Sequence, residues 1–161
     1  MSAFEKIAAN LNFPMTIVTT RLGDEMDGCL VGFSTQCSID PVRYLVCLSV
    51  ANRTYEIARS APTLVVHMLH DAPHDRALAH LFGEHTARDT DKLAQCEWTE
   101  GLDGVPVLEG CDWFAGPVIQ RSDVGDHVAH VVEVVTGSAS RVDEPWLVYW
   151  EVQDLEAGNP A

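Results

Sequence analysis

The most informative stretch of the sequence runs from Gly28 to Val50 and reads GCLVGFSTQCSIDPVRYLVCLSV. Two parts of it, Cys29–Thr35 and Tyr44–Val50, are rich in β-branched and aromatic residues, which is typical of strands. Small and hydroxyl-bearing residues follow the first of these strands, and Asp40-Pro41 then predicts a turn. The stretch therefore predicts two strands joined by a polar connection.

Outside this stretch, the pattern is again mainly that of short strands. We predict a polar hairpin loop at Arg21–Gly28, where two glycines and three acids occur together. Further strands are expected at Met15–Thr20, Leu64–Leu69, Val105–Leu108, Phe114–Arg121, Val128–Val135 and Trp146–Trp150. Many short strands with few helices indicate a mainly β protein, folded as a closed or nearly closed barrel.

Two or three short helices complete the prediction. Ser2 and Glu5 have the spacing of a capping box, and apolar residues recur after them at helical intervals. We expect further helices at Thr54–Ser60 and Asp75–Phe82, and a single turn at Thr90–Leu93.

Length and charge set limits on organisation and partners. At 161 residues we expect one domain over 1–161, with its core at about 12–150 and a loosely ordered tail at 153–161. A net charge of −14 argues against nucleic-acid binding, and an anionic ligand would need local cations or backbone N–H groups. No apolar run is long enough to cross a membrane, and no secretory signal is visible, so we expect a cytoplasmic protein with five free cysteines.

The polar run at 34–38 has two readings. Small residues there would let a flat heteroaromatic ring approach backbone N–H groups and hydroxyls, whereas a plain polar turn explains the same residues without any ligand. Composition alone leaves both open.

Taken together, several segments resemble the flavin reductase-like, FMN-binding split-barrel family. The run at 28–41 is similar to that family's Gly-x-x-x-Ser-Ser-Phe-Thr-Ser-x-Ser-x-x-Pro-Pro signature, and Tyr44–Leu48 to the strand that follows it. The similarity continues in family order through residues 51–55, 64–69, 78–82, 91–92, 104–108 and 125–127. It covers roughly residues 12 to 150 and implies a Greek-key split β-barrel.

The resemblance also implies ligands, partners and site residues. The cofactor would be FMN, with FAD as an alternative, and NADH or NADPH would be the hydride donor. The protein would be a homodimer, with a monooxygenase as a possible partner. The residues implied at the flavin ring are Phe33, Ser34, Thr35, Gln36 and Cys37, those at the phosphate are Asn52, Arg53 and Thr54, and Phe82 and Lys92 match positions toward the ribityl-phosphate end.

Some of these roles also make chemical sense from the residues themselves. Arg53 and Thr54 lie where a helix begins and offer a guanidinium, a hydroxyl and free N–H groups to a phosphate. A plain N-capped surface helix is the alternative. Cys37 is either redox-active beside the flavin or a packing residue.

His127 is the catalytic candidate. It follows Gly125-Asp126 at the predicted start of a strand, and its counterpart in the family is implicated in nicotinamide binding. A turn histidine with no task is the alternative. Histidines 67, 70, 74, 80 and 85 show no HxH or HExxH spacing, so we expect no metal site.

The sequence departs from the family pattern in three places. Gly32 and Gln36 replace two expected serines, Val42 replaces the second proline, and Glu151 stands where a C-terminal glycine is usual. These departures leave flavin binding better supported than reductase activity. Alternatives are a non-catalytic FMN protein, or a barrel that binds a deazaflavin or a haem, with His67 or His127 as the axial ligand.

Overall fold

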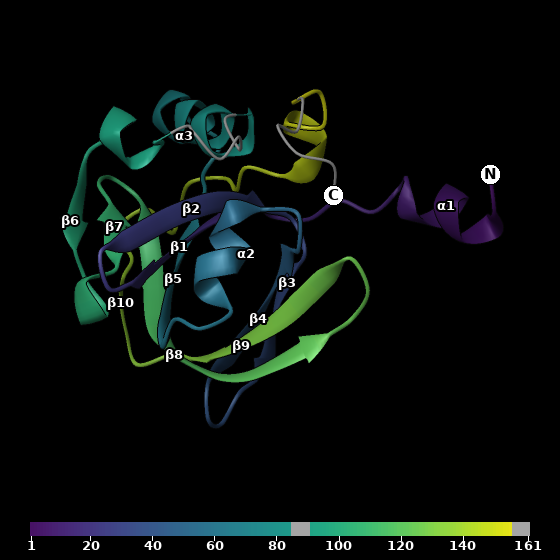
Figure 1. Ribbon diagram of the computed structural model, residues 1–161. Coiled ribbons are helices and arrows are strands. Elements are labelled where there is room, and N and C mark those ends of the chain that lie inside the picture. The colour runs from purple at the N-terminus through teal and green to yellow at the C-terminus, as the bar shows by residue number, and fades with distance from the viewer. Residues whose placement is uncertain (85–90, 156–161) are drawn as a thin grey trace.

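A curled antiparallel sheet forms the body of the computed structural model, which describes residues 1–84 and 91–155 (Figure 1). Along the sheet the strands follow the order β2-β1-β5-β8-β9-β4-β3, with β10 paired to β8, and β6 and β7 form a separate pair. The fold is mainly β, as predicted, and its curled sheet is that of a split barrel. The strands are β1 Thr16–Leu22, β2 Glu25–Val31, β3 Ser34–Ser38, β4 Arg43–Ser49, β5 Thr63–Met68, β6 Trp98–Glu100, β7 Pro106–Leu108, β8 Asp112–Asp123, β9 His127–Glu133 and β10 Thr136–Ser138.

Strand β8 joins the two halves of the sheet. Residues 112–117 pair with β5, residues 118–123 pair with β9, and the register shifts between Val118 and Gln120. A register shift of this kind bends a strand and increases its twist. The bend allows a single sheet to curl far enough to enclose a core.

The hairpin predicted at Arg21–Gly28 is present, but its loop is much shorter than predicted. Strand β1 continues to Leu22 and pairs with Glu25, so only Gly23 and Asp24 form the turn. Gly23 has a φ of 62°, the left-handed backbone that glycine adopts readily in tight hairpins. The acidic residues misled the prediction, because one of them, Asp27, lies buried in β2 beside charged and polar partners.

Two strand predictions also need correction. The segment Cys29–Thr35 is not one strand, because β2 ends at Val31 and β3 begins at Ser34. Residues 146–150 make only isolated bridges, to His70 and Pro14, before the 3-10 helix η3 at Tyr149–Glu151. They cross the end of the sheet instead of pairing along an edge, which a strand-like composition does not reveal.

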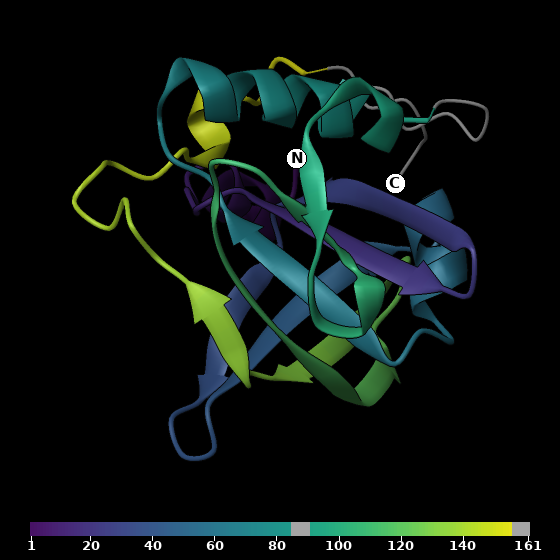
Figure 2. The same cartoon turned by 90° about the vertical axis from the view of Figure 1, so that its left-hand side faces the viewer.

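In the part of the chain that the structure describes, three α-helices accompany the sheet, namely α1 Ala3–Ala8, α2 Arg53–Ala58 and α3 Pro73–Glu84. The predicted capping box of α1 is present, with Ser2 and Glu5 as its two partners. Helix α2 packs against β1 and β2, while α3 lies across one end of the sheet beside the C-terminal segment (Figures 1 and 2). A core cluster there joins Leu78 and Phe82 of α3 to Leu147 and Val152.

Some predictions fall on residues that the structure does not describe. These are Thr90 of the predicted turn, whose described part continues into the 3-10 helix η1 at Leu93–Gln95, and 156–161 of the predicted tail. In the described ranges, no helix combines the length and the hydropathy needed to span a bilayer.

Candidate functional site

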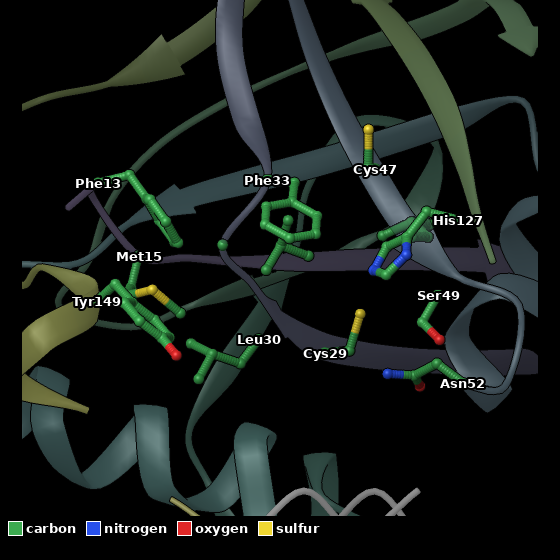
Figure 3. Close-up of a pocket in the computed structure, with 13 residues that line it drawn as sticks. Phe13, Met15, Cys29, Leu30, Phe33, Cys47, Ser49, Asn52, His127 and Tyr149 are labelled. Atoms are coloured by element: carbon green, nitrogen blue, oxygen red, sulfur yellow. The ribbon is translucent and has the colours of Figure 1, made fainter. Parts of the chain in front are cut away.

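A pocket of about 250 Å³ opens between the end of β2 and the neighbouring ends of β4 and β9. This volume is just below the ~300–1,000 Å³ that is usual for small-molecule sites. Its walls come from the ends of β2 and β4, the start of β9 and the start of α2, and from two more distant segments. The lining residues are Phe13, Met15, Cys29, Leu30, Val31, Gly32, Phe33, Cys47, Leu48, Ser49, Asn52, His127 and Tyr149 (Figure 3).

Four rings follow one another along this pocket. The Tyr149 and Phe13 rings are stacked with centroids 4.9 Å apart, Phe13 lies 6.1 Å from Phe33, and Phe33 lies 5.2 Å from His127. Figure 3 shows Phe13 and Tyr149 at one end of the pocket, and His127, Ser49 and Asn52 at the other. One end is therefore aromatic and apolar, whereas the other carries polar groups.

Gly32 makes the aromatic end possible. A Cβ added at this residue would lie 2.7 Å from the Phe13 ring. The absence of a side chain thus allows Phe13 to pack over the link between β2 and β3. The departure from the family signature at Gly32 has a packing reason.

His127 has a defined orientation. Its Nδ1 lies 2.7 Å from a carboxylate oxygen of Asp126, so the ring donates this hydrogen bond. The side chain is 17% exposed and contacts the Phe33 ring. Its other nitrogen, Nε2, takes no part in this hydrogen bond, and His127 lines the polar end of the pocket.

Only part of the predicted flavin-ring segment reaches the pocket. Phe33 lines it, whereas Ser34 forms a 2.9 Å hydrogen bond with the hydroxyl of Tyr44. Gln36 and Cys37 lie on the exposed strand β3, in a separate shallow hollow of the surface, and Thr35 is exposed beside them. The roles of Ser34, Thr35, Gln36 and Cys37 in binding a flavin remain predictions.

The predicted phosphate residues are split in the same way. Asn52 lines the pocket, and its side-chain oxygen accepts a hydrogen bond from the amide of Thr54, so it caps α2. Thr54 is fully buried and donates its hydroxyl proton to Asp27, whereas Arg53 is partly exposed at the start of the helix. The N-capped helix of the alternative reading is present.

Phe82 and Lys92 lie in the core and outside the pocket lining. Phe82 is fully buried, and Lys92 Nζ stands 5.6 Å from its ring centroid. The same ammonium donates a hydrogen bond to the carbonyl of Gly28 and lies 3.6 Å from an oxygen of Asp27.

Two cysteines line the pocket, but neither is activated. Burial raises the pKa of Cys29 to about 11 and also raises the pKa of Cys47. Thiolate is the reactive form of cysteine, so both act as small apolar wall residues at neutral pH.

The other histidines belong to separate networks. Both ring nitrogens of His67 are hydrogen bonded, to the carbonyl of Ile17 and to the amide of Leu108, so this ring is not available as a haem ligand. His70 pairs with Asp112, while His85 lies outside the described residues. Within the described ranges, no three His, Cys, Asp or Glu side chains are grouped to bind a metal.

Besides Ser49 and several apolar wall residues, sequence reasoning missed the two aromatic residues Phe13 and Tyr149. They flank the barrel in sequence and reach the pocket through hydrogen bonds between distant segments, such as that from the Tyr149 amide to the Phe13 carbonyl. The only local signal was the concentration of aromatic residues in Trp146–Trp150.

Comparisons with known proteins agree with this architecture. The family model described as "Flavin reductase like domain" matches residues 8–156. A probable flavin reductase of Rhizobium meliloti (strain 1021) is 30% identical over 118 residues, which are 70% of this chain and 36% of that protein. The reductase subunit HsaB of a flavin-dependent monooxygenase, from Rhodococcus jostii (strain RHA1), is 30% identical over 84% of this chain and 67% of its own length.

A solved structure shows the same fold at lower identity. The NADH:FAD oxidoreductase SgcE6 of Streptomyces globisporus C-1027 superposes with a TM-score of 0.79 at 22% identity, over 90% of this chain and 85% of its own. The match covers only 36% of the Rhizobium relative, so the activity of that whole protein is not assigned to this chain. The family model, by contrast, covers nearly the whole chain, and the chain therefore belongs to the flavin reductase-like family.

Proposed function

We propose that this protein is an NAD(P)H-dependent flavin reductase. The observation that carries the proposal is the pocket, in which a row of rings ends at a histidine oriented by Asp126. Membership of the flavin reductase-like family supports the same activity. The monooxygenase reductase subunit and the NADH:FAD oxidoreductase among its relatives support it further.

The lining of the pocket fits a flat heteroaromatic ring. Aromatic side chains favour offset or edge contacts with other rings, and Phe33 and Phe13 are placed to make such contacts. Ser49 and Asn52 provide hydrogen-bonding groups at the opposite end, where the polar edge of a flavin would lie. When bound, a flavin would supply the electron acceptor for a hydride donated by the nicotinamide.

The protein's main contribution is to hold two rings in register and to limit water. Asp126 fixes the His127 ring through Nδ1, which leaves Nε2 to contact a ligand beside Phe33. His127 is thus our candidate for the residue that positions the nicotinamide over the flavin.

The same proposal includes partners and location. Homodimers are the most frequent oligomers, and exposed apolar residues on α1 give such a dimer a surface. The similarity to HsaB supports a monooxygenase as the consumer of the reduced flavin. All five cysteines are free, which supports a reducing, cytoplasmic location.

The activity is tested by following nicotinamide absorbance with purified protein, with and without added FMN or FAD. We expect consumption of NADH or NADPH that depends on the flavin. A flavin that binds but stays oxidised under anaerobic NADH and NADPH would contradict the reductase proposal, and would identify a non-catalytic flavin-binding protein.

The variant His127→Asn tests the position of the nicotinamide. We expect anaerobic flavin reduction to slow by roughly 10-fold to 100-fold, because misaligned rings react slowly, while flavin affinity changes much less. His80→Asn is the matched control, since His80 is exposed on α3 and absent from the pocket lining. Equal reduction rates in the two variants would show that His127 does not position the nicotinamide.

A further inference from the structure

A buried carboxylate lies on β2, the strand whose end lines the pocket. Asp27 is on β2 and is 4% exposed. Because side chains alternate along a strand, it shares a face with Cys29 and Val31, both of which line the pocket. Burial of a charged group is unfavourable unless partners compensate it, so the surroundings of Asp27 need an explanation.

Thr54 and Lys92 provide those partners. The Thr54 hydroxyl donates to Oδ2 of Asp27 at 3.1 Å, and Lys92 Nζ stands 3.6 Å from Oδ1. Lys92 is 2% exposed and also donates to the carbonyl of Gly28. One buried carboxylate thus engages both a hydroxyl and an ammonium that would otherwise suit an anion.

These contacts with Asp27 leave few hydrogen-bond donors and little positive charge free to bind a phosphate ester. A threonine hydroxyl has a single proton to donate, and that of Thr54 is directed to Asp27. The Lys92 charge is balanced by Asp27, and a phosphate brought next to this carboxylate would be repelled. In the described part of this region, Arg53 remains as a cation, and it lies partly exposed to solvent, where a charge contributes little.

We propose that Asp27 determines the specificity of the pocket. It takes the Thr54 and Lys92 contacts that an anionic group of the ligand would otherwise use. The site then recognises the flavin ring and not its terminal phosphate, so it binds riboflavin and FMN with similar affinity. This inference rests on the proposed function, because it concerns the same pocket and the same class of ligand.

The first test uses the unmodified protein. Riboflavin and FMN are each titrated against it, and the dissociation constants are read from the quenching of flavin fluorescence. We expect the two constants to lie within about 5-fold of each other, because the partly exposed Arg53 contributes little to phosphate binding. FMN binding more than about 50-fold tighter than riboflavin would overturn the inference, since such a difference needs charge-assisted contacts to the phosphate.

The second test changes the residues that interact around Asp27. Thr54→Val removes the hydroxyl and keeps the shape of the side chain, and we expect the ratio of the two constants to stay unchanged. Asp27→Asn leaves Lys92 without its counter-ion, so FMN should gain about 10-fold over riboflavin. Asp24→Asn, in the exposed β1–β2 turn, removes the same charge at a distance and should leave the ratio unaltered.

The outcomes separate the two proposals. If neither flavin binds, the proposed function fails, and the assignment of Asp27 fails with it. If both bind but Thr54→Val abolishes a strong preference for FMN, only the assignment of Asp27 fails. The titration of the unmodified protein and Thr54→Val decide the matter even if Asp27→Asn does not fold.

Discussion

His67 shows how one residue connects three strands. On β5, its Nδ1–H donates to the carbonyl of Ile17 in β1, and its Nε2 accepts from the amide of Leu108 in β7, each at 2.9 Å. A ring used in this way carries one proton and is neutral. His70 has different partners, because its two ring nitrogens face the carbonyl of Glu144 and the carboxylate of Asp112.

The neutral state of His67 predicts a pH dependence of stability. Burial lowers its pKa from 6.5 to about 4, so between these values the unfolded chain binds a proton that the folded protein does not. Stability from this group is therefore complete above pH 6.5 and is lost as the pH falls toward 4, by up to about 3 kcal/mol.

The measurement is the free energy of unfolding in urea at several pH values for the wild type, His67→Leu and His80→Leu. We expect His67→Leu to be less stable at pH 7 and to have a flatter profile between pH 6.5 and 4. The exposed His80 serves as the control, and its variant should follow the wild-type profile. Parallel profiles for all three proteins would show that His67 does not set this dependence.

At the level of elements, the close approach of β8 to the end of β9 depends on Gly116. This glycine pairs with Leu64 of β5, and a Cβ added to it would overlap the backbone carbonyl of Glu133, the last residue of β9. Backbone cannot move aside as a flexible side chain can, so the sheet would have to open at its bend.

Gly116→Ala should therefore destabilise the protein by about 3 kcal/mol or more. Ser122→Ala, farther along β8, is the control, because it shortens a side chain in the same strand without adding an atom near β9. Urea unfolding monitored by tryptophan fluorescence compares the two variants. A midpoint for Gly116→Ala equal to that of the control would mean that the close approach of β8 and β9 tolerates a side chain.

Elements with strong local signals were predictable from the sequence. The runs Tyr44–Val50 and Leu64–Leu69 are apolar and β-branched, and they became β4 and β5 within about one residue at each end. The hairpin at Gly23 was predicted, but its short turn was not, because Asp27 reads as a loop residue until Lys92 and Thr54 are placed beside it. The partners that compensate the buried charge of Asp27 lie far from it in the chain, so local sequence does not reveal them.

The pocket, like the fold, was predictable only where its residues belong to local motifs. Phe33, Asn52 and His127 lie within or next to motifs, and these three line the pocket. Phe13 and Tyr149 belong to no motif and meet only because the two ends of the barrel sequence pack together. Long-range packing of this kind leaves no periodicity in the sequence.

For the whole molecule, helix α1 raises the question of what it packs against. None of its residues is buried, and Figure 1 shows it standing away from the sheet. Phe4 and Ile7 are 72% and 62% exposed, and Leu11 just beyond the helix is 52% exposed. An isolated helix shorter than ~12 residues is marginal in water, so α1 needs an apolar surface to be stable.

We expect a second copy of the chain to provide that surface in the proposed homodimer. Sedimentation equilibrium at micromolar concentration should then give about twice the chain mass of 17.7 kDa. The double variant Phe4→Asp and Ile7→Asp should shift the protein toward the monomer, because it would place two carboxylates in the apolar contact. Lys6→Ala, a polar position on the same helix, should leave the dimer intact. A wild-type protein that sediments as a monomer would contradict the dimer. A dimer that survives the double variant would show that the copies associate through the barrel and not through α1.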